Sequence, residues 1–279
     1  MSTPLPPLRL GLRPDDLAAL REEAGAARLP PRRRLYGIGM GKTGTNALAS
    51  LFAGVPAAHE AGAEDLIDAV LDYESGRTDG RGLRDLVIAR DARLGLEVDV
   101  SNLNIFLVDL LVAMDGDAKF VLTVRDPRSW LESIMNHYLQ RPPTARWRAM
   151  ADHRFGGGGP VHPPEERALA ERGLYPLSGY LRYWRAHLDK AIEAVPAERL
   201  LVVPTERIAD EADRIAAFAG FRPESVDRSR IREYRNSAKE PILASVPADH
   251  LEERIRTHCG SIGGRDFPEF LPVGPSTPR

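Results

Sequence analysis

The sequence predicts an α/β fold in which a mainly parallel, P-loop-like sheet is flanked by helices. Two apolar runs, at residues 35–39 and 119–124, have the length and composition of buried strands. Each run ends in a turn that leads into a segment with helical spacing, and strands alternate with helices along most of the chain. A Gly-rich loop at residues 39–45 joins the first strand to its helix. We expect one domain over residues 1–279.

The first half of the chain holds the Gly-rich loop and most of the expected strands. A helix is expected at 14–27, and the helix after the loop should begin near Thr45 or Asn46, because both are good N-cap residues. The further elements expected here are helices over 65–73 and 103–114, an ambiguous segment at 83–93, and short strands at 55–56 and 96–98.

The second half begins with the clearest strand, at residues 119–124. Arg125-Asp126-Pro127 ends this strand, and Pro127 suits the first position of the next helix. Residues 140–176 are rich in proline, contain four successive glycines and have few aliphatic residues, so we expect a mobile helical and loop excursion that acts as a lid. The remaining predictions are helices over 177–195, 208–219 and 248–258 and a strand at 200–203.

Composition narrows the class of protein. The formal net charge is -2, whereas a nucleic-acid binder is usually basic, so we expect no nucleic-acid partner. The single cysteine, Cys259, excludes an intrachain disulfide and a cysteine-based zinc cluster. No apolar run has the length of a membrane span, and the N-terminus lacks an apolar signal-peptide core. A cytoplasmic location is the default expectation.

The Gly-rich loop predicts an anion site. Glycines let the backbone approach an anion closely, and successive N–H groups before a helix point toward it. Lys42 adds a full positive charge beside Thr43 and Thr45. A kinase or nucleotide hydrolase that uses ATP and magnesium is the alternative interpretation. Its pattern requires a glycine at position 36, which is Tyr36 here, and an acidic residue for the metal, for which Asp99 is the candidate.

In these motifs the chain resembles the sulfotransferase superfamily, whose donor is 3′-phosphoadenosine 5′-phosphosulfate (PAPS). The family loop Pro/Gly-Lys-Ser/Thr-Gly-Thr-Thr/Ser corresponds to Gly41-Lys42-Thr43-Gly44-Thr45-Asn46, with Asn46 as the departure. The family's arginine at a strand end, followed eight residues later by serine, corresponds to Arg125 and Ser133. A strand with a Thr-Glu pair and an apolar helix at residues 200–221 extends the similarity.

The resemblance implies a PAPS-dependent sulfotransferase of the bacterial small-molecule type. Residues 41–46 would hold the 5′-phosphosulfate, with Lys42 also stabilising the leaving phosphate. Arg125 and Ser133 would bind the 3′-phosphate. A late basic loop would close over the donor, and its candidates are Arg235, Ser237 and Lys239. The product would be 3′-phosphoadenosine 5′-phosphate (PAP), and no metal is expected. A binding protein that retains a degenerate nucleotide fold is a further alternative.

The acceptor is expected to be a small molecule with a hydroxyl group, which needs a general base. Glu60 is the favoured candidate, followed by His59 and then by Asp99, expected just after its strand. Because side chains alternate along a strand, one of His59 and Glu60 should face the site and the other away. Aromatic residues that offer walls for the acceptor, or else belong to the core, are Tyr138, Trp147, Phe155, Tyr175, Tyr180 and Trp184.

Overall fold

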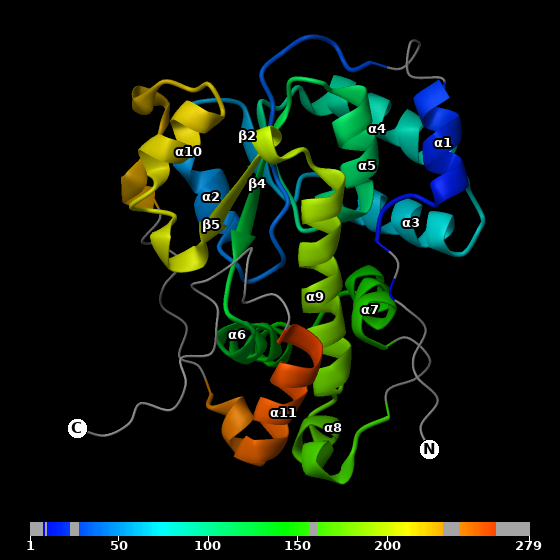
Figure 1. The fold of residues 1–279 in the computed structure, drawn as a ribbon, viewed down its shortest axis with the longest axis vertical. Helices are drawn as coiled ribbons and strands as arrows, with labels where there is room; N and C mark the ends of the chain where they lie inside the picture. Colours follow the sequence, from blue (N-terminus) through cyan, green and yellow to red (C-terminus); the bar gives the residue numbers. More distant parts are fainter. Residues whose placement is uncertain (1–7, 9, 23–27, 157–160, 231–239, 261–279) are drawn as a thin grey trace.

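The computed structural model contains a five-stranded sheet in which all strands are parallel, in the order β2-β3-β1-β4-β5 (Figure 1). It describes residues 8, 10–22, 28–156, 161–230 and 240–260. The strands are β1 (Leu35–Gly37), β2 (Ala57–His59), β3 (Val98–Val100), β4 (Lys119–Val124) and β5 (Leu200–Pro204). The predicted fold class is therefore confirmed.

Helices cover both faces of the sheet, and the strand residues alternate between two apolar clusters. Along β4, Phe120 and Leu122 join the larger cluster, whereas Val121 joins the smaller one, as the two-residue repeat of a strand requires. The larger cluster lies with α1 (Pro14–Glu22), α3 (Ala63–Glu74), α4 (Gly80–Leu94), α5 (Asn104–Met114) and α9 (Leu177–Ala194). The smaller lies with α2 (Thr45–Leu51) and α10 (Ala212–Phe218).

Several predicted boundaries are corrected. The ambiguous segment at 83–93 belongs to α4, whose Asp79 caps the first turn by accepting from the Gly82 N–H at 3.0 Å. The second and third strands lie two residues later than predicted, at β2 and β3. The helix expected at 208–219 is the shorter α10, while α11 (Ala248–Cys259) lies where a helix was predicted. None of the described helices is both long and apolar enough to cross a membrane.

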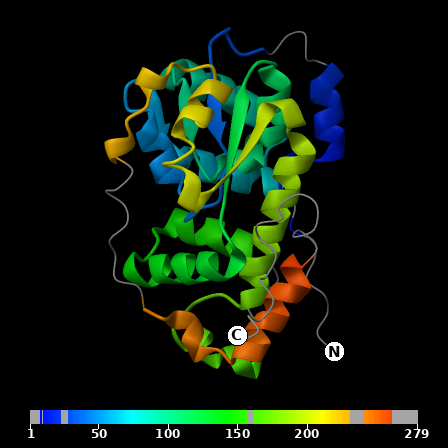
Figure 2. The ribbon, with the colours of Figure 1, turned by 60° about the vertical axis from the view of Figure 1, so that its left-hand side comes forward.

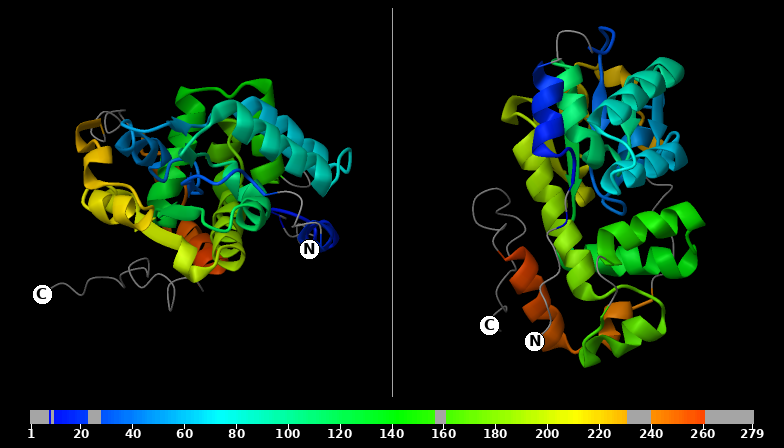
Figure 3. Two further views of the ribbon diagram at one scale, coloured as in Figure 1. Left: turned by 90° about the horizontal axis from the view of Figure 1, so that it is seen from above. Right: turned by 90° about the vertical axis from the view of Figure 1, so that its right-hand side faces the viewer.

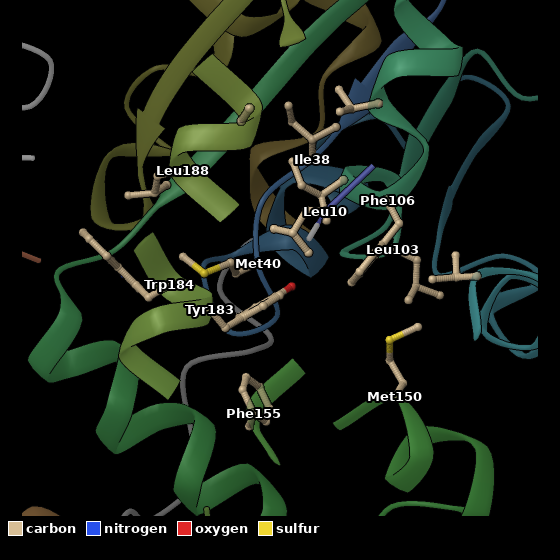
Figure 4. Close-up of a cluster of buried hydrophobic side chains, with 14 of the residues drawn as sticks. Leu10, Ile38, Met40, Leu103, Phe106, Met150, Phe155, Tyr183, Trp184 and Leu188 are labelled. Atoms are coloured by element: carbon tan, nitrogen blue, oxygen red, sulfur yellow. The ribbon is translucent and has the colours of Figure 1, made fainter. Parts of the chain in front are cut away.

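The described part of the 140–176 excursion is packed into the protein. It contains α7 (Ala145–Ala151), a π-helical turn at Asp152–Gly156 and α8 (Arg167–Glu171). Figure 4 shows Met150 and Phe155 facing the same apolar cluster as Tyr183 of α9 and Phe106 of α5. The predicted short helices are thus present, and their buried side chains belong to the core. A lid function for this segment remains a prediction.

All five strands end at the same edge of the sheet because they are parallel. Helix α6 (Pro127–Gln140) lies beyond the end of β4 at this edge, and α9 begins beyond the edge and runs back so that its second half lies along the sheet (Figures 1 and 2). Helix α11 packs beside the first half of α9, away from the sheet (Figure 3). Ligands of open α/β sheets bind at this carboxyl edge, so the loops that leave it form the candidate site.

Candidate active site

The loop between β1 and α2 has a left-handed backbone at two positions, a conformation that glycine adopts more readily than other residues. Lys42 has a φ of 72° and Gly44 a φ of 90°, both in the left-handed region. Helix α2 begins at Thr45 with Gly44 as its N-cap, which corrects the prediction that Thr45 or Asn46 caps it. A Cβ on Gly39 would lie 1.9 Å from Thr123 Oγ1, so this position admits only glycine without a shift of its neighbours.

Side chains from three other parts of the chain donate hydrogen bonds to the carbonyl groups of this loop. Trp130 Nε1 of α6 donates to the Gly41 carbonyl at 2.9 Å, and Thr205 Oγ1, just after β5, donates to that of Thr43 at 2.8 Å. Arg125 Nη1 donates to the Lys42 carbonyl at 3.3 Å. The carbonyls are thus turned toward these donors, while the Thr43 N–H donates to the Met40 carbonyl at 3.2 Å, so the shape of the loop is fixed from within the protein.

The Thr43 side chain has a structural role. It is fully buried, and its hydroxyl lies 2.7 Å from the Met40 carbonyl and 2.8 Å from Thr123 Oγ1. These contacts join the loop to β4. The hydroxyl and the N–H of Thr43 are therefore both engaged within the protein, the N–H with the Met40 carbonyl at 3.2 Å, whereas Lys42 brings the side-chain charge.

Arg125 leaves the end of β4 beside the loop. Its Nε donates to Ser129 Oγ at 3.0 Å, and burial lowers the pKa of its guanidinium, an effect opposed by Asp126 and Glu206. Ser133 is buried one turn further along α6. A cavity of about 720 Å³ opens beside Arg125, between the start of α6 and the segment that leads into α11. The structure thus brings the loop and the Arg-Asp-Pro motif together at one edge.

His137 is a neighbour of Lys42 that the sequence reasoning missed. It follows Ser133 by four residues on α6, so both lie on the same side of that helix. Burial, followed by the positive charges of Lys42 and Arg141, lowers the pKa of His137 to about 4. The side chain is neutral at physiological pH and adds no charge beside Lys42. The four-residue spacing from Ser133 is the signal that could have found it.

His59 and Glu60 both face the site, which corrects the prediction that one of them points away. The strand ends at His59, and Glu60 has a φ of 54°, so the alternation of the strand is broken. His59 Nε2 lies 3.0 Å from Thr45 Oγ1 at the end of the loop and 3.9 Å from Glu60 Oε1. Burial lowers the pKa of His59, and the Glu60 carboxylate opposes this shift.

The residues after β3 hold the Glu60 carboxylate. Ser101 Oγ donates to Glu60 Oε2 at 2.6 Å, the Asn102 N–H donates to Glu60 Oε1 at 3.0 Å, and the Asn102 side-chain amide donates to the same oxygen. Neither Ser101 nor Asn102 was predicted. Their place directly after a strand of a parallel sheet is the signal that could have found them.

Lys42 and Glu60 are the non-glycine residues with positive φ in the described parts of the chain. Such a backbone costs of the order of 1–3 kcal/mol and persists where the surroundings impose it, most often at functional sites. Two side chains singled out for their chemistry thus stand on strained backbone at one edge of the sheet.

Asp99 lies inside β3 and not after it. Arg90 of α4 pairs with both oxygens of its carboxylate, one of them at 3.0 Å, and the residue is only 5% exposed. A cavity of about 20 Å³ lined by Tyr36, Arg90, Asp99 and Asn104 lies on this side of the sheet, under α4 and α5. Asp99 is therefore committed to an ion pair on the far side of β3 from the Gly-rich loop.

The remaining candidates divide into two groups. Arg235, Ser237 and Lys239 lie outside the described residues. Most of the aromatic residues considered as acceptor walls pack with one another: the Phe155 ring lies 4.6 Å from that of Tyr180 and 5.5 Å from that of Tyr175, and Trp184 Nε1 donates to the Arg125 carbonyl at 3.1 Å. These rings are core residues that support the site, while Trp147 is only half-buried.

Comparison with known proteins gives one family and a group of distant structures. A family model described as a sulfotransferase domain matches residues 34–207. Among solved structures, a sulfotransferase from Alicyclobacillus acidocaldarius is 15% identical with a TM-score of 0.48, covering 84% of this chain and 96% of that chain. Sulfotransferase STF9 from Mycobacterium avium is 14% identical with a TM-score of 0.45, covering 88% and 81%. Mouse sulfotransferase SULT7A1 complexed with PAP is 16% identical with a TM-score of 0.35, covering 86% and 78%. No curated protein sequence matches the chain.

Proposed function

The chain belongs to the sulfotransferase domain family, and we propose that it transfers a sulfuryl group from PAPS to a hydroxyl group of a small-molecule acceptor. The observation that carries the proposal is the loop at residues 39–45, whose carbonyls accept hydrogen bonds from Trp130, Arg125 and Thr205 and which places Lys42 beside Arg125 at the carboxyl edge of the sheet. The family match covers this loop and the Arg-Asp-Pro motif beside it.

In this proposal two positive side chains divide the donor between them. Lys42 and the loop N–H groups hold the 5′-phosphosulfate, with Gly41, Gly44 and Asn46 as further parts of that site. Arg125 binds the 3′-phosphate with its forked guanidinium, with Ser133 behind it on α6. The cavity beside Arg125 supports this division, since it leaves space at the guanidinium.

Transfer requires that charge on the leaving phosphate be stabilised while the acceptor hydroxyl loses its proton. The acceptor oxygen forms a bond to sulfur as the bond from sulfur to the 5′-phosphate oxygen breaks, and PAP leaves with the electron pair of that bond. Lys42 and the loop amides stabilise this charge. In this proposal the hydroxyl proton passes to a base beside the sulfate end of the donor.

His59 is the proton acceptor that the geometry favours, and Glu60 is its charge partner. The imidazole is kept neutral by burial and lies next to the loop hydroxyl of Thr45, whereas Glu60 already accepts bonds from Ser101 and Asn102. The Glu60 carboxylate would stabilise the imidazolium that forms. Asp99 is not assigned a role in proton transfer, because its carboxylate is paired with the guanidinium of Arg90.

The first test is the thermal unfolding of the full chain with candidate ligands. At 100-fold excess over its Kd, PAP should raise Tm by about 5 °C, because binding to the folded state alone adds about 2.7 kcal/mol. EDTA should leave this shift unchanged. A shift that appears only with ATP and magnesium would contradict the proposal and support a kinase or nucleotide hydrolase. Transfer of radiolabelled sulfate from PAPS to a panel of phenols and alcohols then separates an enzyme from a binding protein.

Arg125→Ala should weaken PAP binding by about 10- to 150-fold, the effect of about 1.5–3 kcal/mol for a hydrogen bond to a charged group. Binding of adenosine 5′-phosphosulfate, which lacks the 3′-phosphate, should change far less. Both affinities are measured by calorimetry. Arg167→Ala is the control, since Arg167 is an exposed arginine of α8 that pairs with Glu171 and does not line the cavity beside Arg125. An equal loss of affinity for both nucleotides would show that Arg125 does not bind the 3′-phosphate.

A further inference from the structure

Arg154 is a nearly buried arginine in the described part of the 140–176 excursion. It lies in the π-helical turn at Asp152–Gly156 and is 5% exposed. Its guanidinium lies over the rings of Tyr183 at 5.4 Å, Phe106 at 5.5 Å and Trp147 at 6.0 Å. Figure 4 shows two of these rings, Phe106 and Tyr183, at the centre of the apolar cluster. These aromatic rings hold the charged group in place by cation–π contacts.

The hydrogen bonds of Arg154 lead from this aromatic setting to the candidate active site. Arg154 Nη2 donates to Asn102 Oδ1, and the Asn102 side-chain amide donates to Glu60 Oε1. A guanidinium can only donate and a carboxylate can only accept, so the orientation of the Asn102 amide is forced at both ends. Asn102 therefore transmits the position of Arg154 to the Glu60 carboxylate, which lies 3.9 Å from His59 Nε2.

We propose that Arg154, in the turn at Asp152–Gly156, is a positioning residue for the proton-accepting pair of His59 and Glu60. The inference rests on the proposed function. In the reaction, the acceptor proton passes to His59, and Glu60 must stay beside the imidazolium to stabilise its charge. Arg154 does not touch the reacting atoms. It keeps Asn102, and through it Glu60, in the required place.

The packing of α9 fixes the backbone that carries Arg154. A Cβ on Gly179 would lie 2.1 Å from the carbonyl oxygen of Phe155, the residue next to Arg154. This glycine is what allows the π-helical turn to approach the helix so closely. The turn also packs through the Phe155 ring, 5.3 Å from that of Tyr183. The position of Arg154 is thus set by the main chain as well as by its side-chain contacts.

The main test is Arg154→Met, which keeps much of the apolar stem and removes the donor groups. We expect kcat for an acceptor found in the PAPS panel to fall about 10- to 100-fold, as when a group that orients a catalytic residue is lost. The Kd of PAP should stay within about two-fold, since Arg154 does not reach the donor in this assignment. The acidic limb of the pH profile of kcat/KM should move to lower pH, because Glu60 no longer raises the pKa of His59. Arg154→Lys should recover only part of the rate.

A double-mutant cycle separates positioning from a loss of folding. In a Glu60→Gln background, Arg154→Met should have little further effect on kcat, because both changes act through one carboxylate. Asn102→Ala breaks the same connection in the middle and serves if Arg154→Met does not fold. The control is Arg146→Met, which removes a half-exposed arginine of α7 that pairs with Glu64 and Asp68.

The outcomes also distinguish this inference from the proposed function. If the unmodified chain transfers sulfate but Arg154→Met keeps its kcat, or lowers it equally with and without Glu60, the positioning role is wrong and the proposed function stands. If the unmodified chain transfers no sulfate from PAPS, the proposed function and the inference fall together.

Discussion

Replacement of Lys42 by alanine is expected to lower kcat for sulfuryl transfer by about 10²- to 10³-fold. That is the typical loss when one group stabilising developing negative charge is removed from an active site. In the proposed mechanism Lys42 neutralises charge on the leaving phosphate as the sulfur–oxygen bond breaks. The measurement is single-turnover transfer from radiolabelled PAPS, with the bound fraction of donor determined separately.

The left-handed backbone at Lys42 adds a prediction on stability that does not depend on the reaction. Alanine at a φ of 72° keeps the strain, while glycine adopts this region freely, so Lys42→Gly should be about 1 kcal/mol more stable than Lys42→Ala. In thermal unfolding this corresponds to a difference in Tm of about 2 °C. Both variants should be equally impaired in transfer.

Two results would contradict this account in different ways. An alanine variant that keeps its kcat would remove Lys42 from the chemistry. Equal Tm values for the alanine and glycine variants would show that the loop backbone relaxes when the side chain is lost. Lys42→Arg is the control for charge: it keeps the positive charge but replaces a compact ammonium by a larger planar group, so we expect partial activity.

Features that depend on local sequence were predictable here. The strand at 119–124, the Pro127 helix start and the Gly-rich loop are each encoded by a few adjacent residues, and the structure has all three. The same local motifs carry the family resemblance, and the match of the sulfotransferase domain model to residues 34–207 confirms it. That the sheet is parallel followed from the alternation of strands and helices, whereas its strand order comes from long-range packing.

Features that depend on register or on distant contacts were not predictable. Placing the third strand at 96–98 put Asp99 at its end, but with β3 at Val98–Val100 the residue is inside the strand, where the packing against α4 supplies Arg90. The positive φ of Glu60 brings it beside His59 against the expected alternation. Arg154 reaches Asn102 across 52 residues, and no local pattern indicates that contact.

Replacement of His59 by alanine is expected to lower kcat by about 10²- to 10⁴-fold, the usual contribution of a positioned general base. Donor binding should change little, because the phosphosulfate is held by Lys42 and the loop. The distinguishing measurement is the pH dependence of kcat/KM. In the unmodified chain the rate should rise with pH as His59 loses its proton. Since burial lowers the pKa of His59, this rise should lie below pH 6.5, its ordinary value.

The sign of this pH dependence separates His59 from Glu60 as the proton acceptor. If His59 is the base, Glu60→Gln removes a negative charge 3.9 Å away, so the pKa of His59 falls and the acidic limb moves to lower pH while activity is reduced but present. If Glu60 is itself the base, Glu60→Gln abolishes the limb together with the rate, and His59→Ala leaves the limb in place. The two assignments thus predict opposite changes of the acidic limb in Glu60→Gln and His59→Ala. The pH profiles of these two variants therefore identify which of the neighbouring residues is the base.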